Sequence, residues 1–199
     1  MKLTSKKQRS LDDLATTAKP LSGIFFRAVE FRWMHPDDVM SGAGAAKLGG
    51  RFVPVGTRAL YVSDSEETLL QEIAGRKRRL GGKALIDLDK YPRVTFRIDL
   101  KLERHISFAD AFQTKDFQRI RGQCLDVDNL AASQAAGSYL AGLGVQAILY
   151  PSVAGAGTNV VVFLENTRPG QVVLFNRAEV IDQLARLSRA RSNKSGQVP

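Results

Sequence analysis

Apolar residues recur along the 199-residue chain with two spacings, one typical of strands and the other of helices. Short runs rich in Val, Ile, Phe and Tyr indicate strands, because β-branched and aromatic side chains fit a pleated, half-buried surface. Longer segments with apolar residues every three or four positions indicate amphipathic helices. The pattern predicts strands at residues 23–31, 59–63, 93–100, 145–152, 159–166 and 171–176, and helices at 65–80, 129–144 and 180–192.

The segments between these elements indicate where strands end and where helices begin. A His-Pro pair ends the first predicted strand, and residues 41–56 form a glycine-rich loop longer than a compact fold usually keeps without a use. Asp64, followed three residues later by Glu67, resembles the capping box that begins a helix. Residues 1–20 indicate an arm with at most a short helix.

The order of the elements indicates the fold class. Strands dominate both ends of the chain, and helices are inserted between them. Regular alternation of strand and helix is absent, so the pattern does not favour a doubly wound parallel sheet. Hydrophobic residues make up 44% of the chain and charged residues 25%, as in an ordinary globular domain. The sequence therefore predicts a compact α+β domain on a bent or split mixed sheet.

Hydrophobicity, cysteine content and charge indicate the cellular compartment and the possible partners. No apolar run approaches the ~20 residues of a membrane span, and no secretory leader is predicted. The single cysteine, Cys124, cannot form an internal disulfide. These features indicate a cytoplasmic protein. Much of the net charge of +9 lies in clusters at residues 2–9, 76–79 and 186–194. The clusters fit solvated ends and a helix C-terminus, or a nucleic-acid footprint, but no nucleic-acid-binding motif accompanies them.

Several kinds of catalytic site lack their residues in this sequence. His35 and His105 are the only histidines, and neither has a carboxylate or cysteine at metal-ligand spacing. There is no G-x-S-x-G motif, so a nucleophile-elbow hydrolase is not expected. The glycines at 42–50 and 155–157 do not fit the dinucleotide fingerprint G-x-G-x-x-G and indicate turns instead.

Five positions each allow a structural and a functional interpretation. Arg27 interrupts an apolar strand, where it forms a buried ion pair, reaches water at an edge, or binds a phosphate. Arg51 follows two glycines that permit close approach to a ligand, or is a solvated loop residue. Tyr61 fits a core or edge position, and Glu72 lies off the apolar stripe of its predicted helix. Ser152 directly follows a predicted strand, where most serines cap turns.

Taken in chain order, these residues form one pattern. The stretches FFRAVE, GGRFVPVGTRALYVSDSEETLLQE and ILYPSVAGAGTNVVVF resemble the RES domain family. This family, named for its arginine, glutamate and serine, supplies the toxins of Xre–RES toxin–antitoxin operons. The similarity extends over residues 23–166. Two features depart from the family pattern: Phe52-Val53 follow the G-G-R motif, and the central helix has no tryptophan.

The resemblance implies an ADP-ribosyltransferase-like fold and an enzyme whose substrate is NAD. RES domain toxins deplete NAD by cleaving its nicotinamide–ribose bond with water or phosphate as acceptor, and some instead transfer ADP-ribose to a target protein. The implied partner is an Xre-type antitoxin that covers the active site, and neither a metal nor a membrane is expected. The implied layout is an N-terminal arm at 1–20, a RES-like catalytic domain at 21–190 and a flexible C-terminal tail at 191–199.

The resemblance also gives the candidate residues roles. Arg27 and Arg51 are expected to bind the pyrophosphate and the adjacent ribose of NAD, and Tyr61 to flank the nicotinamide ring. Glu72 is expected to bind a ribose hydroxyl and to stabilise the positive charge that develops as the bond breaks. Glu72, Tyr61 and Arg51 are the predicted catalytic group.

The remaining candidates lie near the end of the chain. Ser152 is expected to fix the pyrophosphate or the second arginine from the opposite wall of the site, with Asn159 assisting. A basic nucleic-acid-binding or RNA-directed toxin is a third interpretation, which rests on net charge alone and ranks below both enzymatic ones because it leaves residues 48–75 unexplained.

Overall fold

The computed structural model of the chain describes residues 4–79, 93–109, 115–126 and 129–182. Within these ranges the labelled helical segments are α1 (Ser5–Thr16), η1 (Phe31–Trp33), α2 (Pro36–Met40), α3 (Ala43–Leu48), α4 (Glu66–Arg79), α5 (Lys115–Leu125), α6 (Ala131–Gly142) and η2 (Leu164–Asn166), and residues 177–182 are also helical. The strands are β1 (Lys19–Glu30), β2 (Ala59–Ser63), β3 (Arg93–Ser107), β4 (Ala147–Pro151), β5 (Thr158–Phe163) and β6 (Val172–Leu174).

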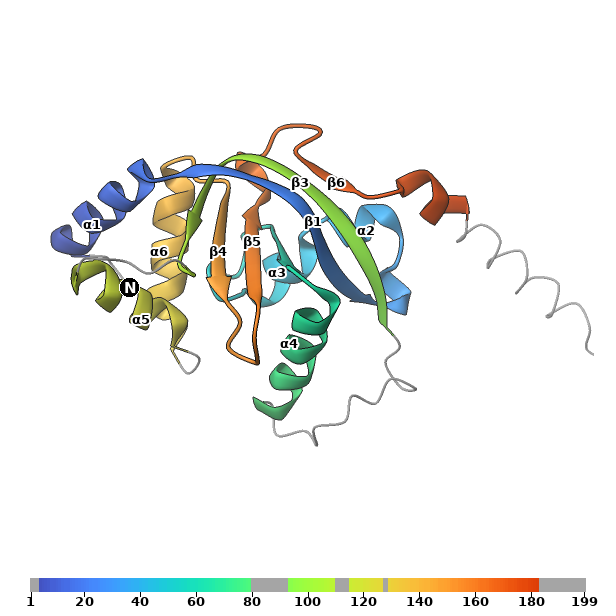
Figure 1. Cartoon of the computed structure of the whole chain (residues 1–199), viewed down its shortest axis with the longest axis horizontal. Coiled ribbons are helices and arrows are strands. Elements are labelled where there is room, and N and C mark those ends of the chain that lie inside the picture. The colour runs from blue at the N-terminus through green and yellow to red at the C-terminus, as the bar shows by residue number, and fades with distance from the viewer. Residues whose placement is uncertain (1–3, 80–92, 110–114, 127–128, 183–199) are drawn as a thin grey trace, which may run out of the picture.

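The strands form one mixed sheet that bends until it closes on itself. Neighbours follow the order β1–β2–β5–β4–β3–β6, and β1 also pairs with β3, so five strands complete a barrel-like ring. The β1–β3 ladder runs from Lys19↔His105 to Glu30↔Arg93, whereas β1 meets β2 only at Phe26↔Ser63. The long pair β1 and β3 arches over β4 and β5 (Figure 1). The predicted α+β fold on a bent mixed sheet is confirmed.

Two hydrophobic cores lie on opposite faces of the short strands β2, β5 and β4. Side chains alternate between the faces of a strand, so Leu60 and Val62 point to one core while Ala59 and Tyr61 point to the other. The first core lies inside the bent sheet, under β1 and β3. The second lies between the sheet and helices α1, α5 and α6, which Figure 1 shows grouped at one end of the molecule.

The glycine-rich stretch at 41–56 is not one loop, as the sequence predicted. Residues 43–48 form α3, and the glycines on either side, Gly42 and Gly49, have φ angles of +67° and +70°. Such left-handed conformations favour glycine, and here they allow the chain to turn sharply at both ends of a short alanine-rich helix. The turn after α3 brings the G-G-R motif back towards β2.

Two other local predictions differ from the structure. Helix α4 begins with Ser65 as its cap, because Oγ of Ser65 accepts a hydrogen bond from the backbone N–H of Thr68 over 3.1 Å. Asp64, which the sequence indicated for this role, binds Thr158 instead. Residues 5–16, expected to carry at most a short helix, form α1, whose Leu11 and Leu14 are each only 1% exposed.

Two further observations concern the helices. The helix predicted at 180–192 begins at residue 177 and continues to the last described residue, 182; the rest of that prediction lies outside the described residues. None of the helices in the described ranges is long and apolar enough to cross a membrane.

Candidate active site

Glu72 on α4 is the point where three separate segments of the chain meet. The hydroxyl of Ser152 donates a hydrogen bond to Oε1 of Glu72 over 2.6 Å, and the side-chain amide of Asn159 donates to the same oxygen over 2.8 Å. The backbone N–H of Val153 donates to it over 3.3 Å. Every hydrogen bond that the described residues make to this carboxylate ends on Oε1, and none of them reaches Oε2.

The register of the sheet places these polar groups on one face. Ser63 on β2 pairs with Asn159 on β5, and Asn159 in turn pairs with Tyr150 on β4. Directly paired residues point to the same side of a sheet. The hydroxyl of Ser63 donates to Oδ1 of Asn159 over 2.7 Å, which orients the amide so that Nδ2 faces Glu72.

Tyr61 lies on the same face and covers the G-G-R motif. A Cβ atom added at Gly50 would overlap the hydroxyl of Tyr61, so only glycine fits beneath this ring. The Tyr61 hydroxyl accepts a hydrogen bond from the backbone N–H of Phe52 over 3.2 Å. On the other side, Gln134 on α6 donates to the carbonyl of Gly50 over 3.0 Å. The glycines therefore allow the motif to fit between β2 and α6.

Arg51 turns towards the end of α5. Its Nη1 donates to the carbonyls of Cys124 and Asp126, over 3.2 and 3.0 Å. A cation at this position is favourable because the last carbonyls of a helix lack partners and carry partial negative charge. These bonds fix where the guanidinium stands, and both use Nη1.

Arg27 is half-buried on the inner face of β1, between Phe25 and Val29. Its Nε donates to the carbonyl of Val39 over 2.9 Å, and its Nη1 donates to the carbonyl of Tyr61 over 3.0 Å. Burial lowers the pKa of Arg27 to about 10. Of the structural interpretations that the sequence left open, neither a carboxylate partner nor an edge position describes it: its partners in the described residues are backbone carbonyls.

Tyr150 links the parts of the site and was missed by the sequence interpretation. It is 6% exposed and packs edge-on against Phe52, with ring centroids 5.0 Å apart. Burial raises the pKa of Tyr150 well above its usual value, and the charges of Tyr61 and Glu72 raise it further while Arg51 opposes them. Tyr150 therefore lies within electrostatic reach of all three predicted catalytic residues. The only signal was its place immediately before the Pro-Ser pair.

The predicted site residues thus fall into two groups. Glu72, Ser152 and Asn159 are joined directly by hydrogen bonds, and Tyr61 shares their face of the sheet. The two arginines form the second group and do not bond to Glu72. The described hydrogen bonds of Arg27 and Arg51 are to backbone carbonyls.

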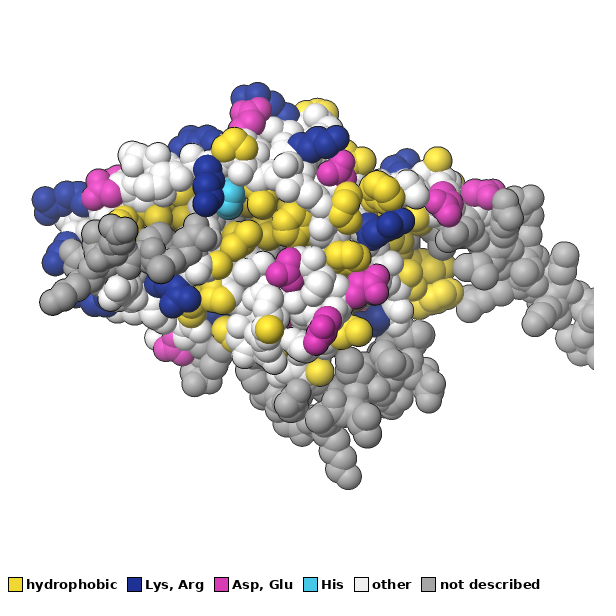
Figure 2. All heavy atoms as spheres, in the orientation of Figure 1, with side chains coloured by type: hydrophobic (Ala, Val, Ile, Leu, Met, Phe, Trp, Pro, Cys, Tyr) yellow, Lys and Arg dark blue, Asp and Glu magenta, His cyan; other side chains and the backbone are white. Residues whose placement is uncertain are grey.

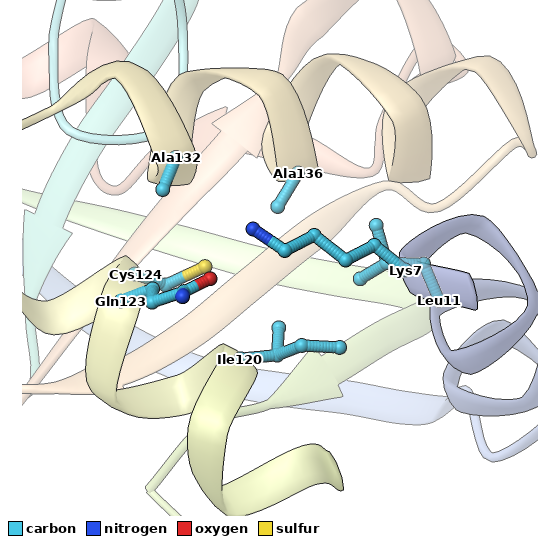
Figure 3. A pocket seen from close by; sticks show the side chains of 7 residues that line it. All are labelled: Lys7, Leu11, Ile120, Gln123, Cys124, Ala132 and Ala136. Carbon is cyan, nitrogen blue, oxygen red and sulfur yellow. The ribbon is translucent and has the colours of Figure 1, made fainter. Parts of the chain in front are cut away.

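Two other features of the molecule lie apart from this site. Lys7 and Cys124 help to line a cavity of about 10 Å³ between α1, α5 and α6 (Figure 3), which is too small for more than one water molecule. On the face shown in Figure 2, Lys and Arg side chains are interspersed with Asp and Glu and form no single basic patch. Within the described ranges, no group of three or more His, Cys, Asp and Glu side chains is placed to hold a metal ion.

Comparison with known proteins settles the family. The model of the RES domain matches residues 24–181 of the chain. The chain belongs to the RES domain family. The resemblance inferred from the arginine, glutamate and serine stretches is therefore confirmed, and Arg27, Glu72 and Ser152 all lie within the matched region.

Individual RES domain proteins share both sequence and fold with this one. Proteins named NAD(+) phosphorylase MbcT, from Mycobacterium tuberculosis and Mycobacterium bovis, are 26% identical over 156 residues, which is 77% of this chain and 82% of theirs. The crystal structure of the M. tuberculosis MbcT–MbcA toxin–antitoxin complex contains a chain of similar fold, with a TM-score of 0.69 and 21% identity. That match covers 91% of this chain and 98% of the other.

Proposed function

We propose that this RES domain protein is a toxin that cleaves the nicotinamide–ribose bond of NAD+, with inorganic phosphate as the acceptor. Phosphate oxygen forms a new bond to the ribose carbon while the bond to the nicotinamide nitrogen breaks, which yields nicotinamide and ADP-ribose 1-phosphate. Family membership and the relatives named NAD(+) phosphorylase support this reaction. The observation that carries it in this chain is the carboxylate of Glu72, held on one oxygen only.

The geometry of Glu72 suits a reaction that develops positive charge. Cleavage of an N-glycosidic bond with a cationic leaving group passes through a state with oxocarbenium character on the ribose. A carboxylate fixed in place before the reaction stabilises that charge without reorganising. Ser152, Val153 and Asn159 fix Oε1, so we assign Oε2 to the ribose hydroxyl and the developing cation.

The other residues are assigned to substrate binding. Arg51 uses Nη1 for the end of α5, which leaves Nε and Nη2 to bind the pyrophosphate. Arg27 keeps one N–H of Nη1 and both of Nη2 for the substrate, and we assign it to the pyrophosphate as well. Tyr61 flanks the nicotinamide ring, and Asn159 supports the ribose side through Glu72.

A protein partner follows from the toxin assignment. The mycobacterial neighbour of similar fold was solved in complex with its antitoxin. We propose that a cognate antitoxin binds this chain and prevents NAD from reaching Glu72. The proposed setting is the cytoplasm, where NAD is available to deplete. Adding purified antitoxin to the purified enzyme should therefore stop NAD loss.

The test of the reaction is NAD consumption by purified protein, with and without phosphate. Phosphate should accelerate NAD loss and give ADP-ribose 1-phosphate by mass spectrometry, whereas free ADP-ribose alone would indicate hydrolysis. A labelled protein band from labelled NAD would indicate transfer to a protein. The proposal is wrong if the wild-type protein leaves NAD intact under all these conditions.

Two variants on the same helix test the role of Glu72. Glu72→Gln keeps the shape of the side chain but removes its charge, and should lower kcat by about 100-fold or more. Glu66→Gln is the matched control, because Glu66 is exposed in the first turn of α4. It should retain wild-type activity. A Glu72→Gln enzyme with wild-type kcat would remove Glu72 from the mechanism.

A further inference from the structure

The β4–β5 loop (residues 152–157) carries two of the three groups that hold Glu72. Ser152 and Val153 both donate to Oε1, and the Ser152 hydroxyl in turn accepts a hydrogen bond from the backbone N–H of Ala154 over 3.1 Å. A shift of this loop therefore moves the donors of the carboxylate directly. What fixes the loop also fixes Glu72.

The far end of the loop is bound to the start of α4 by a second set of contacts, which we call the clasp (Asp64, Ser65 and Thr68 with Ala156 and Thr158). Oδ2 of Asp64 accepts hydrogen bonds from both the backbone N–H and the hydroxyl of Thr158, over 2.7 and 2.8 Å. The backbone N–H of Asp64 donates to the carbonyl of Thr158 over 3.0 Å. Thr68 donates to the carbonyl of Ala156 over 3.2 Å, and Ser65 bonds to Thr68.

Glycines allow the loop to lie flat on α4 between these two sets of contacts. A Cβ atom at Gly155 would overlap Oε1 of Gln71, and one at Gly157 would overlap Oγ1 of Thr68. Gly157 also has a φ of +100°, which other residues rarely adopt. Thr68, Gln71 and Glu72 are spaced three and four residues apart, so they share one face of the helix. The loop therefore contacts α4 along a continuous strip from the clasp to Glu72.

Electrostatics strengthen the clasp. Partial burial alone would raise the pKa of Asp64, but the polar surroundings that Thr68, Thr158 and Ser65 provide, with hydrogen bonds from the backbone and hydroxyl of Thr158, outweigh burial and lower the pKa. Asp64 is therefore ionised at neutral pH, and its bonds to Thr158 are charge-assisted. Such bonds are stronger and shorter than neutral ones.

From these contacts we infer that Asp64 is a positioning residue for the reaction: through Thr158 it holds the β4–β5 loop so that Ser152 and Val153 face Glu72. Asp64 touches none of the reacting atoms. It precedes the first residue of α4, Glu66, and acts through the loop alone. The inference rests on the proposed function of Glu72, but concerns a residue and a set of contacts outside that site.

The kinetic test compares substitutions at Asp64 under saturating phosphate. Asp64→Ala should lower kcat for NAD by about 10- to 100-fold, because small misplacement of a catalytic group is costly. KM should change by less than about threefold, since the clasp does not contact substrate. Asp64→Asn keeps an acceptor for Thr158 and should recover most of the loss. Glu66→Ala removes a neighbouring charge without touching the loop, and should match the wild type.

A second comparison separates positioning from loss of stability. If Asp64 acts through Ser152 and Val153, the Asp64→Ala substitution should lower kcat less in a Ser152→Ala background, where only Val153 remains to be displaced, than in the wild type. Wild-type kcat in Asp64→Ala, or a loss fully explained by a smaller folded fraction, would overturn the inference. Losses that multiply in the double variant would do the same.

Hydrogen exchange keeps this test independent of the proposed reaction. If the wild-type protein does not consume NAD, the proposed function fails, and exchange at the backbone amides of residues 152–158 then decides the inference. Asp64→Ala should accelerate exchange at Val153 while leaving that of the β2–β5 ladder unchanged. Equal exchange at Val153 in the wild type and in Asp64→Ala would overturn the clasp as a positioning device.

Discussion

Ser152 and Glu72 lie 80 positions apart in the chain and 2.6 Å apart in space, hydroxyl to carboxylate oxygen. The hydroxyl accepts a hydrogen bond from the N–H of Ala154, so its own proton points at Glu72. This arrangement makes Ser152 a hydrogen-bond donor to the carboxylate of Glu72. The serine and glutamate of the family name form one unit in this protein.

Substitutions of Ser152 and Glu72 should therefore have non-additive effects on kcat. Ser152→Ala removes the shortest of the bonds to Oε1 and should lower kcat by about 10-fold, because Val153 and Asn159 still hold the oxygen. The double variant Ser152→Ala/Glu72→Gln should be no slower than Glu72→Gln alone. Steady-state NAD assays on the four proteins give the coupling. Independent, multiplicative losses would show that Ser152 contributes elsewhere, for example at the pyrophosphate.

The second prediction concerns Gly137, where α6 packs against the backbone that follows the G-G-R motif. A Cβ atom at this buried position would overlap the carbonyl of Phe52. The obstacle is backbone, so it cannot rotate away. Gly137→Ala should therefore destabilise the protein by about 1–3 kcal/mol, although alanine is the better helix former. Urea unfolding measures the difference.

Gly142 supplies the control on the same helix. It is exposed, and no heavy atom in the described structure lies within 4 Å of a Cβ placed there. Gly142→Ala should leave stability unchanged or raise it by up to about 1 kcal/mol. If both substitutions stabilised the protein equally, the close contact between α6 and Phe52 would be absent in solution.

How far the sequence predicts this molecule depends on the range of the interactions involved. Strand β2 and the body of α4 were predicted because their patterns are local: a short apolar run at 59–63, and an apolar stripe after a polar start. Helix α3 was missed because six alanine- and glycine-rich residues carry no periodic pattern. Its ends are set by the glycines around it and by packing on β2.

In the candidate site, too, local patterns identified residues, whereas contacts between distant segments could not be predicted. Glu72, Ser152 and Asn159 were named from the order of motifs, yet no spacing in the sequence says that all three meet at one oxygen. That meeting depends on the β2–β5 register, which pairs Ser63 with Asn159. Asp64 was assigned to the helix cap for a related reason: the local pattern identified a capping acid, but its partner, Thr158, lies 94 residues away.

The last prediction distinguishes a structural role of Arg27 from a purely substrate-binding one. Its guanidinium joins the carbonyl of Val39 to that of Tyr61, at the place where β1 diverges from β2 after their single paired position. Arg27→Ala would remove the guanidinium donor from both partly buried carbonyls. The free energy of unfolding should fall by about 2–4 kcal/mol without any NAD present. A residue that served only the pyrophosphate would lower NAD affinity and leave the stability of the free protein unchanged.

The pH dependence of this difference identifies the partners of Arg27. Burial lowers the folded-state pKa of Arg27 to about 10, below that of a free guanidinium, so the arginine is protonated in both states below about pH 9. Backbone carbonyls do not titrate. The difference in unfolding free energy between wild type and Arg27→Ala should therefore stay constant from about pH 5 to pH 8, as followed by urea unfolding at each pH. If the difference instead fell as pH dropped towards the carboxyl range, the arginine would be paired with an acidic side chain, and the carbonyl contacts would not describe the protein in solution.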